Sequence, residues 1–293
     1  MSAAPIVYLN GSYLPLEEAC VPVLDRGFLL GDGVYEVIPV YGRRAFRLDQ
    51  HLLRLAHSLA AVRIPDPLSR DDWSQVIAEV IARNAGEDQS VYLQVTRGVA
   101  AKRDHAFPEL IEPTVFLMSS VLHTPAGEVL EQGVAAVLCE DIRWARCDIK
   151  AITLLANVLL RQDAIDAGAA EAILVRDGEA VEGAASNLFA VEAGRLVTPP
   201  KGPRLLPGVT RDLILELAAE HGVATAEEPI SVDRLKAADE IWLSSSTREI
   251  MPVIRLDGQA VSGGRPGDVW RQVHGLYQDY KAALRRGGPT ATG

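Results

Sequence analysis

The chain has 293 residues, a formal net charge of −10, and 48% hydrophobic and 23% charged residues. This is an ordinary globular balance, and the length suffices for two domains with a sizeable core. The acidic charge argues against nucleic-acid binding, because contact with phosphate backbones requires clustered lysines and arginines.

Residues 1–121 are predicted to form a small α+β domain, with a few strands and two helices on one side. Residues 24–32 are predicted to be a glycine-punctuated loop, and the last strand looks buried on both faces. Alternating apolar residues predict strands, and apolar residues at helical spacing predict helices. In chain order the strands are expected at 6–9, 12 onward, 33–41, 91–96 and 114–121, and the helices at 49–62 and 69–84.

A linker is predicted at 122–127, where turn-forming residues join two apolar segments. Residues 128–286 are expected to form a larger domain, and 287–293 a disordered tail. Short strands separated by turns suggest a barrel-like, largely antiparallel sheet. The whole chain is therefore expected to be a two-domain α/β (α+β) protein. Its strands are predicted at 134–140, 171–176, 180–181, 188–191 and 196–198, and its helices at 151–167, 211–221 and 268–284.

Lys150 ends the stretch 141–150 and is the only lysine between Lys102 and Lys201. Its neighbours up to Leu160 are mostly apolar, and partial desolvation disfavours the ammonium form. A neutral amine can form a Schiff base with an aldehyde. A lone lysine at a strand-to-helix junction is more often simply solvated, and only a second stretch, 180–190, favours the chemical interpretation.

Together the two stretches resemble the fold-type IV pyridoxal-phosphate enzymes, which include D-amino-acid transaminases, branched-chain transaminases and aminodeoxychorismate lyases. The resemblance covers roughly 6–280, and residues 140–162 look most like the D-amino-acid transaminases. It implies that Lys150 carries pyridoxal 5'-phosphate as a Schiff base and that Glu182 bonds the pyridine nitrogen. A carboxylate there keeps the ring protonated and able to accept electrons.

The resemblance also implies a phosphate site built from Arg54, Val209, Thr210 and Ser246, with Ser245 or Thr247 as less direct matches for the last. Arginine suits phosphate through bidentate, permanently charged contact, and a helix N-terminus offers free N–H donors. The ordinary alternatives are a solvated helix arginine, a helix capped by Thr210, and a polar turn at 244–247.

Arg103 and His105 match an Arg-x-His pair that in D-amino-acid transaminases traps the substrate α-carboxylate together with a tyrosine matching Tyr35. In that family the loop lies over the neighbouring subunit's active site, so the resemblance implies a homodimer with shared sites. A solvated polar loop is the alternative. This chain departs from the type pattern by what looks like an extra residue near Lys102, and by alanines at 184–185 where serines are frequent.

The sequence therefore predicts a transaminase for D-amino acids such as D-alanine and 2-oxo acids such as 2-oxoglutarate, in which Lys150 also moves the proton. The alternatives on the same fold are a branched-chain L-amino-acid transaminase, an (R)-amine transaminase and an aminodeoxychorismate lyase. The Arg103/His105 pair argues against these. A non-catalytic pyridoxal-phosphate-binding protein is the alternative from another class, and Lys150 with Glu182 argues against it.

The three cysteines, Cys20, Cys139 and Cys147, are odd in number and suggest a reducing compartment, so we expect the cytoplasm. The N-terminus lacks a signal-peptide pattern, and no apolar run is long enough for a membrane span. Neither His-x-x-x-His nor Cys-x-x-Cys occurs, so no metal is expected.

Overall fold

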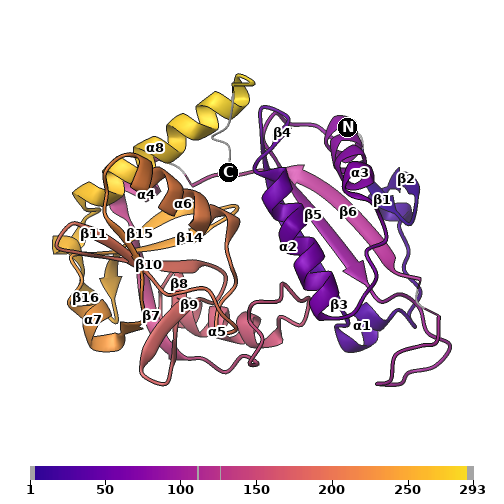
Figure 1. Cartoon of the computed structure of the whole chain (residues 1–293), viewed down its shortest axis with the longest axis horizontal. Coiled ribbons are helices and arrows are strands. Elements are labelled where there is room, and N and C mark those ends of the chain that lie inside the picture. Colours follow the sequence, from indigo (N-terminus) through magenta and orange to yellow (C-terminus); the bar gives the residue numbers. More distant parts are fainter. Residues whose placement is uncertain (1–3, 111, 126, 289–293) are drawn as a thin grey trace. The chain divides into compact units, whose positions relative to one another are not determined.

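The computed structural model describes residues 4–110, 112–125 and 127–288. The chain divides into two compact units, coloured along the sequence in Figure 1. Unit 1 holds the chain up to 123 together with 149–153 and the residues from 283, and unit 2 holds 124–148 and 154–282. Residue 126 of the predicted linker and residues 289–293 of the predicted tail lie outside the described residues.

Unit 1 is built on a six-stranded antiparallel sheet with the order β2-β1-β6-β5-β3-β4. The predicted loop at 24–32 instead contains a short helix, α1, capped by the Asp25 side chain. The elements of the unit are β1 (Ile6–Leu9), β2 (Ser12–Pro15), η1 (Leu16–Glu18), α1 (Arg26–Leu30), β3 (Gly33–Tyr41), β4 (Arg44–Ala45), α2 (Leu48–Ala61), α3 (Arg70–Arg83), β5 (Gln89–Thr96) and β6 (Thr114–Val121).

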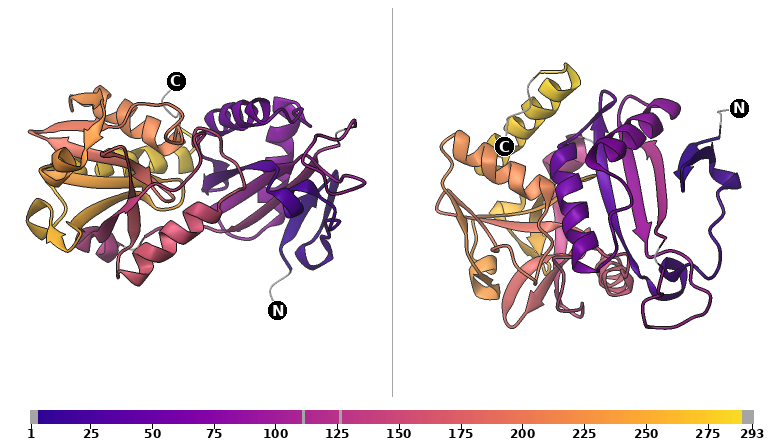
Figure 2. Two further views of the ribbon diagram at one scale, coloured as in Figure 1. Left: turned by 90° about the horizontal axis from the view of Figure 1, so that it is seen from below. Right: turned by 45° about the vertical axis from the view of Figure 1, so that its right-hand side comes forward.

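Helices α2 and α3 cover one face of this sheet (Figure 2). Leu55 of α2 and Trp73 of α3 are buried in the same cluster as Ile38 and Val91 of the strands. Ser69 and Asp72 form a capping box that fixes the start of α3. The expectation that β6 is buried on both faces was wrong: its second face is half-buried and ends in exposed Ser120, because both helices lie on the other side.

Residues 149–153 lie along β3 and contain Lys150. The Tyr35 amide donates to Lys150 O at 2.9 Å, and the Ile152 amide donates to Gly33 O at 3.1 Å. The predicted helix at 151–167 therefore begins only at α5 (Leu155–Asp166), since the backbone of 150–152 is bonded to β3 instead. Gly31, with φ 64°, allows this approach, because a Cβ there would lie 2.4 Å from Thr153 Cγ2.

Unit 2 is built on a ten-stranded mixed sheet that closes into a barrel. Its order β10-β14-β15-β7-β8-β9 returns to β10 through the pair Asn187–Glu182. Most neighbours are antiparallel, and β7 is parallel to both β8 and β15. The elements are α4 (Gly127–Gln132), β7 (Val134–Glu140), α5, β8 (Glu171–Arg176), β9 (Glu179–Gly183), β10 (Asn187–Glu192), β11 (Arg195–Thr198), α6 (Val209–Glu220), β12 (Thr225–Glu227), β13 (Ile230–Ser231), α7 (Val232–Lys236), β14 (Glu240–Ser245), β15 (Glu249–Leu256), β16 (Gln259–Ala260), η2 (Ser262–Gly264) and α8 (Asp268–Arg285).

The predicted start of α6 was two residues too late, whereas the helix predicted at 268–284 is confirmed by α8. Thr210 does not cap α6, because the helix starts earlier and Gly208 is its N-cap. In α8 the residues Val273, Tyr277 and Tyr280 are buried. Across the described ranges, no helix is long and apolar enough to cross a membrane.

Candidate active site

Unit 1 brings Lys150 and Tyr35 together. The hydrogen bond from the Tyr35 amide to Lys150 O holds the two residues side by side, and Lys150 Nζ lies 4.1 Å from the centroid of the Tyr35 ring. Both side chains are half-buried. The ring quadrupole attracts an ammonium over the aromatic face, so this contact favours the observed direction of the Lys150 side chain.

Arg54 is buried rather than solvated, although it lies off the apolar stripe of α2. Its Nε and Nη2 each donate at 2.8 Å to a carboxylate oxygen of Glu36 on β3. His51 Nδ1 lies 2.8 Å from Glu36 Oε2, and burial lowers the pKa of this histidine. The Arg54 guanidinium overcomes the cost of burial and holds the pKa of Glu36 well below its usual range. A permanently charged arginine is thus held in a fixed direction.

Arg103 and His105 have exposed side chains within this chain, on the loop between β5 and β6. The carbonyls of residues 104–106, by contrast, accept hydrogen bonds from the buried Arg26 side chain of α1. The Arg103 guanidinium and the His105 imidazole are thus exposed on a loop whose backbone is held by Arg26. Their role at a substrate carboxylate stays a prediction.

In unit 2, Glu182 lies in a row of polar residues across three neighbouring strands. Asn187 of β10 is paired with Glu182 of β9 on one side and with Ser244 of β14 on the other. Directly opposed residues of antiparallel strands place their side chains on the same face. The barrel closure therefore gathers a carboxylate, an amide and a hydroxyl at one end, and Ser246 lies in the turn that follows β14.

Glu182 is buried and accepts hydrogen bonds from Arg143 Nη1, from the Leu206 amide at 3.1 Å and from Asn187 Nδ2 at 3.3 Å. Arg143 is in turn held by two bonds of 2.9 Å to Asp141. Burial raises the pKa of Glu182 to about 7, and the Arg143 guanidinium opposes a further rise. A carboxyl with this pKa can share a proton with a basic ring nitrogen at neutral pH.

The N-terminus of α6 is close to this row, because Asn187 Nδ2 donates to Leu206 O at 2.8 Å. A Cβ at Gly208 would lie 1.9 Å from Asn187 Oδ1, so only glycine fits at the N-cap. Gly208 supplies no side-chain cap, which leaves first-turn N–H groups to a ligand. Thr210 Oγ1 and Ser244 Oγ are buried and have no hydrogen-bond partner among the described residues.

These donors fit the phosphate of pyridoxal phosphate. A dianion bound at α6 would satisfy the Thr210 hydroxyl and the free N–H groups, and Glu182 would face the ring nitrogen. Asn187 therefore connects two residues that were predicted from the sequence. Its side chain donates to Glu182 and to Leu206 O, just before α6, the helix that contains Thr210. Val209 is the first residue of α6 and is buried.

Four residues that contact or lie beside Arg54 and Glu182 were not predicted as site residues from the sequence: Glu36, Arg143, Asn187 and Ser244. Glu36 alternates with Val34, Ile38 and Val40 on the buried face of β3, and a carboxylate among such apolar residues signals a buried cation as partner. Asn187 and Ser244 are identified only by strand register, which no local pattern contains.

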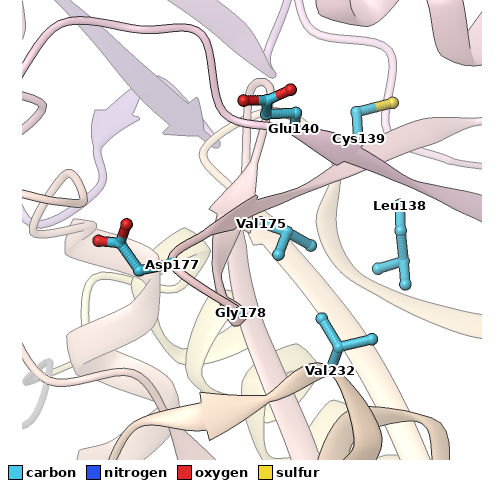
Figure 3. Close-up of a pocket in the computed structure, with 7 residues that line it drawn as sticks. All are labelled: Leu138, Cys139, Glu140, Val175, Asp177, Gly178 and Val232. Carbon is cyan, nitrogen blue, oxygen red and sulfur yellow. The ribbon is translucent and has the colours of Figure 1, made fainter.

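A surface pocket of about 390 Å³ lies elsewhere in unit 2, beside the turn between β8 and β9 (Figure 3). Cys139 and Glu140 of β7 line it together with Asp177 and Val232, and it contains no predicted site residue. Within 4–110, 112–125 and 127–288, no group of three or more His, Cys, Asp or Glu side chains could hold a metal ion.

The sequence is similar to curated D-alanine aminotransferases. The protein from Bacillus licheniformis is 38% identical over 273 residues, which cover 93% of this chain and 96% of that protein. The protein from Staphylococcus aureus (strain COL) is 37% identical and covers 94% of this chain and 97% of its own length.

Solved structures give a second comparison. The branched-chain amino acid aminotransferase of Escherichia coli has a TM-score of 0.91 at 29% identity, covering 99% of this chain and 98% of that one. The branched-chain aminotransferase of the archaeon Thermoproteus uzoniensis, solved with norvaline, has a TM-score of 0.85 at 26% identity, covering 95% of each chain. The family described as amino-transferase class IV matches residues 33–256. With the fold and near-full-length relatives in agreement, the chain belongs to the amino-transferase class IV family.

Proposed function

We propose that the chain is a pyridoxal-phosphate-dependent transaminase that moves the amino group between D-amino acids, such as D-alanine, and 2-oxo acids. The observation that carries the proposal is the row Glu182–Asn187–Ser244 beside the open N-terminus of α6, with two buried hydroxyls left for a ligand. The D-alanine aminotransferase relatives, which match nearly the whole chain, support the substrate class.

Pyridoxal phosphate, when bound, supplies a ring that accepts the electrons released at the substrate Cα. Lys150 would hold the cofactor, and its amine would carry the proton that is released at the substrate Cα. Glu182 would face the ring nitrogen, and Arg143 and the Leu206 amide fix the direction of its carboxylate. Arg54, Val209, Thr210 and Ser246 would bind the phosphate.

Tyr35, Arg103 and His105 bind the substrate α-carboxylate and so decide which enantiomer directs its Cα–H toward Lys150. Three donors around one carboxylate suit this task, since charge-assisted hydrogen bonds are strong. Arg103 and His105 are exposed within one chain, which agrees with a homodimer whose loops complete each other's sites. The three free cysteines agree with a cytoplasmic location.

A branched-chain L-amino-acid transaminase is the second candidate, because solved structures of that activity share the fold closely. Adding D-alanine and then L-alanine to the purified holoenzyme separates the two. We expect the visible absorbance of the Lys150-bound cofactor to be lost with D-alanine in the absence of an acceptor. A response to L-amino acids alone would overturn the D-specific proposal. Pyruvate release from aminodeoxychorismate would indicate an aminodeoxychorismate lyase. A purified protein that does not bind pyridoxal phosphate would be neither a transaminase nor a lyase of this kind.

A further inference from the structure

Arg26, the first residue of α1, is buried and bonds the backbone of the Arg103/His105 loop. Its Nη1 donates to Asp104 O at 2.7 Å and to Ala106 O at 3.1 Å, and its Nη2 donates to His105 O at 3.3 Å. Carbonyls of three successive loop residues thus share one guanidinium. Only the planar fork of arginine can reach them together, because an ammonium is a single point.

A second arginine completes the attachment. Asp32 accepts from Arg26 Nε at 2.7 Å and from Arg97 Nε and Nη2 at 2.8 and 2.9 Å. These two cations outweigh the effect of burial and lower the pKa of Asp32. Arg97 also donates to Arg63 O and Val62 O, which connects the cluster to the end of α2. We call Arg26, Asp32 and Arg97 the anchor cluster.

The loop has one further contact with the anchor cluster, through Phe107. The centre of the Arg97 guanidinium lies 3.7 Å from the Phe107 ring centroid, and that of Arg63 lies 4.7 Å from it on the same ring. The backbone of residues 104–106 and the ring of Phe107 are therefore held by the anchor cluster, whereas the Arg103 and His105 side chains are exposed. A fixed backbone with outward donors is a preorganised binding loop.

We propose that the anchor cluster positions the loop so that Arg103 and His105 present their donors to the substrate α-carboxylate, a role that rests on the proposed function. The cluster touches no reacting atom and acts only through the loop. Removing the anchor leaves the donors present but lets the backbone that carries them move. Substrates with an α-carboxylate then bind more weakly, and amines without one are not affected.

Arg26→Lys tests this directly, because lysine keeps the charge beside Asp32 and cannot reach all of the carbonyls. We expect the KM for D-alanine to rise about 10- to 100-fold, which corresponds to the loss of one or two bonds to a charged group, while kcat changes little. The half-reaction with 1-phenylethylamine should keep its rate. Trypsin cleavage after Lys102 or Arg103 in the native protein should become faster.

Arg43→Lys is the matched control. Arg43, in the turn between β3 and β4, donates to the carbonyls of Ile81, Ala82, Asn84 and Gly86 at and after the end of α3, so it is another guanidinium fork on backbone oxygens. Its variant should lose stability without a change in KM or in cleavage at 102–103. If Arg26→Lys does not fold, Phe107→Ala removes the ring contact instead and should show the same two changes.

An Arg26→Lys protein with wild-type KM and wild-type cleavage would overturn the proposal. Faster cleavage with an unchanged KM would leave the anchor intact as a structural device but remove its role in substrate binding. If the wild-type enzyme does not react with D-alanine at all, the proposed function fails, and the cleavage comparison still decides whether the cluster fixes the loop.

Discussion

Glu36 and Arg54 form a buried bidentate ion pair in which both bonds measure 2.8 Å. One residue is on β3 and the other on α2, so the pair fixes the helix against the sheet as well as the direction of the guanidinium. A buried pair adds little net stability compared with apolar residues, but removing one partner leaves an uncompensated charge. We therefore interpret Glu36 as the residue that holds Arg54 ready for a phosphate.

Glu36→Gln should lower the stability of the apoprotein by about 3–5 kcal/mol and weaken pyridoxal-phosphate binding. Urea unfolding measures the first effect, and a spectroscopic titration with the cofactor measures the second. Asp49→Asn is the control: Asp49 is on the same helix as Arg54, but its pair with Arg70 of α3 is exposed, so this variant should change neither quantity measurably. Unaltered cofactor affinity in Glu36→Gln would show that Arg54 does not bind the phosphate.

Thr210→Val should have opposite effects on the apoprotein and the holoprotein. The hydroxyl is buried without a partner among the described residues, so its removal should stabilise the apoprotein by about 1 kcal/mol. Cofactor affinity should fall about tenfold, the equivalent of one lost hydrogen bond. Thr198→Val is the matched control: its buried hydroxyl donates to Leu188 O at 2.7 Å, so this variant should be less stable. A Thr210 variant with full cofactor affinity would argue against a phosphate at α6.

The stability of the apoprotein should depend on pH through Glu182. Burial raises the pKa of this carboxyl from 4.5 to about 7. Between these values the unfolded chain has lost the proton that the folded protein keeps, so the contribution of Glu182 to the free energy of unfolding falls as the pH rises. Glu182→Gln should lack this fall. Thermal unfolding of both proteins from pH 5 to 8 checks it, and parallel curves would mean that Glu182 is ionised throughout.

In the holoenzyme the Glu182→Gln variant should slow turnover on the order of 10²-fold.

Lys150→Ala should abolish turnover while the fold survives. Borohydride reduction of the wild-type holoenzyme followed by peptide mapping should label Lys150. A label on Lys201 or any other lysine would contradict the assignment.

Arg103→Ala should raise the KM for D-alanine by roughly 10- to 150-fold, since a bond to a charged group contributes about 1.5–3 kcal/mol. The preference for D- over L-alanine should weaken, because the carboxylate trap sets the face of Cα that meets the amine. Steady-state comparison of both enantiomers and a simple (R)-amine measures this. Unchanged D-alanine kinetics would show that residues 103–105 form a solvated loop without a role in substrate binding.

Local patterns predicted the elements better than the contacts between them. The stripe Leu52, Leu55 and Leu59 placed α2 correctly, because burial of a helix face repeats along the sequence. The same pattern gave no sign that Arg54 is buried, since its partner Glu36 comes from another element. The late start of α5 was likewise hidden, because it depends on hydrogen bonds between 150–152 and β3.

In the candidate site, too, single residues were predicted from the sequence better than the contacts between them. Lys150, Glu182 and Thr210 were identified through stretches that resemble a family, and the structure gives the last two a common setting. Ser244 lies two residues before the predicted Ser246 and needed the register of β14 against β10 to be noticed. Arg26 was only one residue of the predicted glycine-punctuated loop, because the carbonyls that it binds are 78 to 80 positions away.

The return of residues 149–153 to unit 1 means that neither unit is an uninterrupted piece of the polypeptide. A fragment ending at 123 would retain Tyr35, Arg54 and the 103–105 loop but would lack the amine, and the amide of Tyr35 would lose its acceptor. No single cleavage or gene fusion point can therefore exchange one half for that of another enzyme. An exchange of unit 1 for that of a relative must therefore include residues 149–153, which contain the lysine.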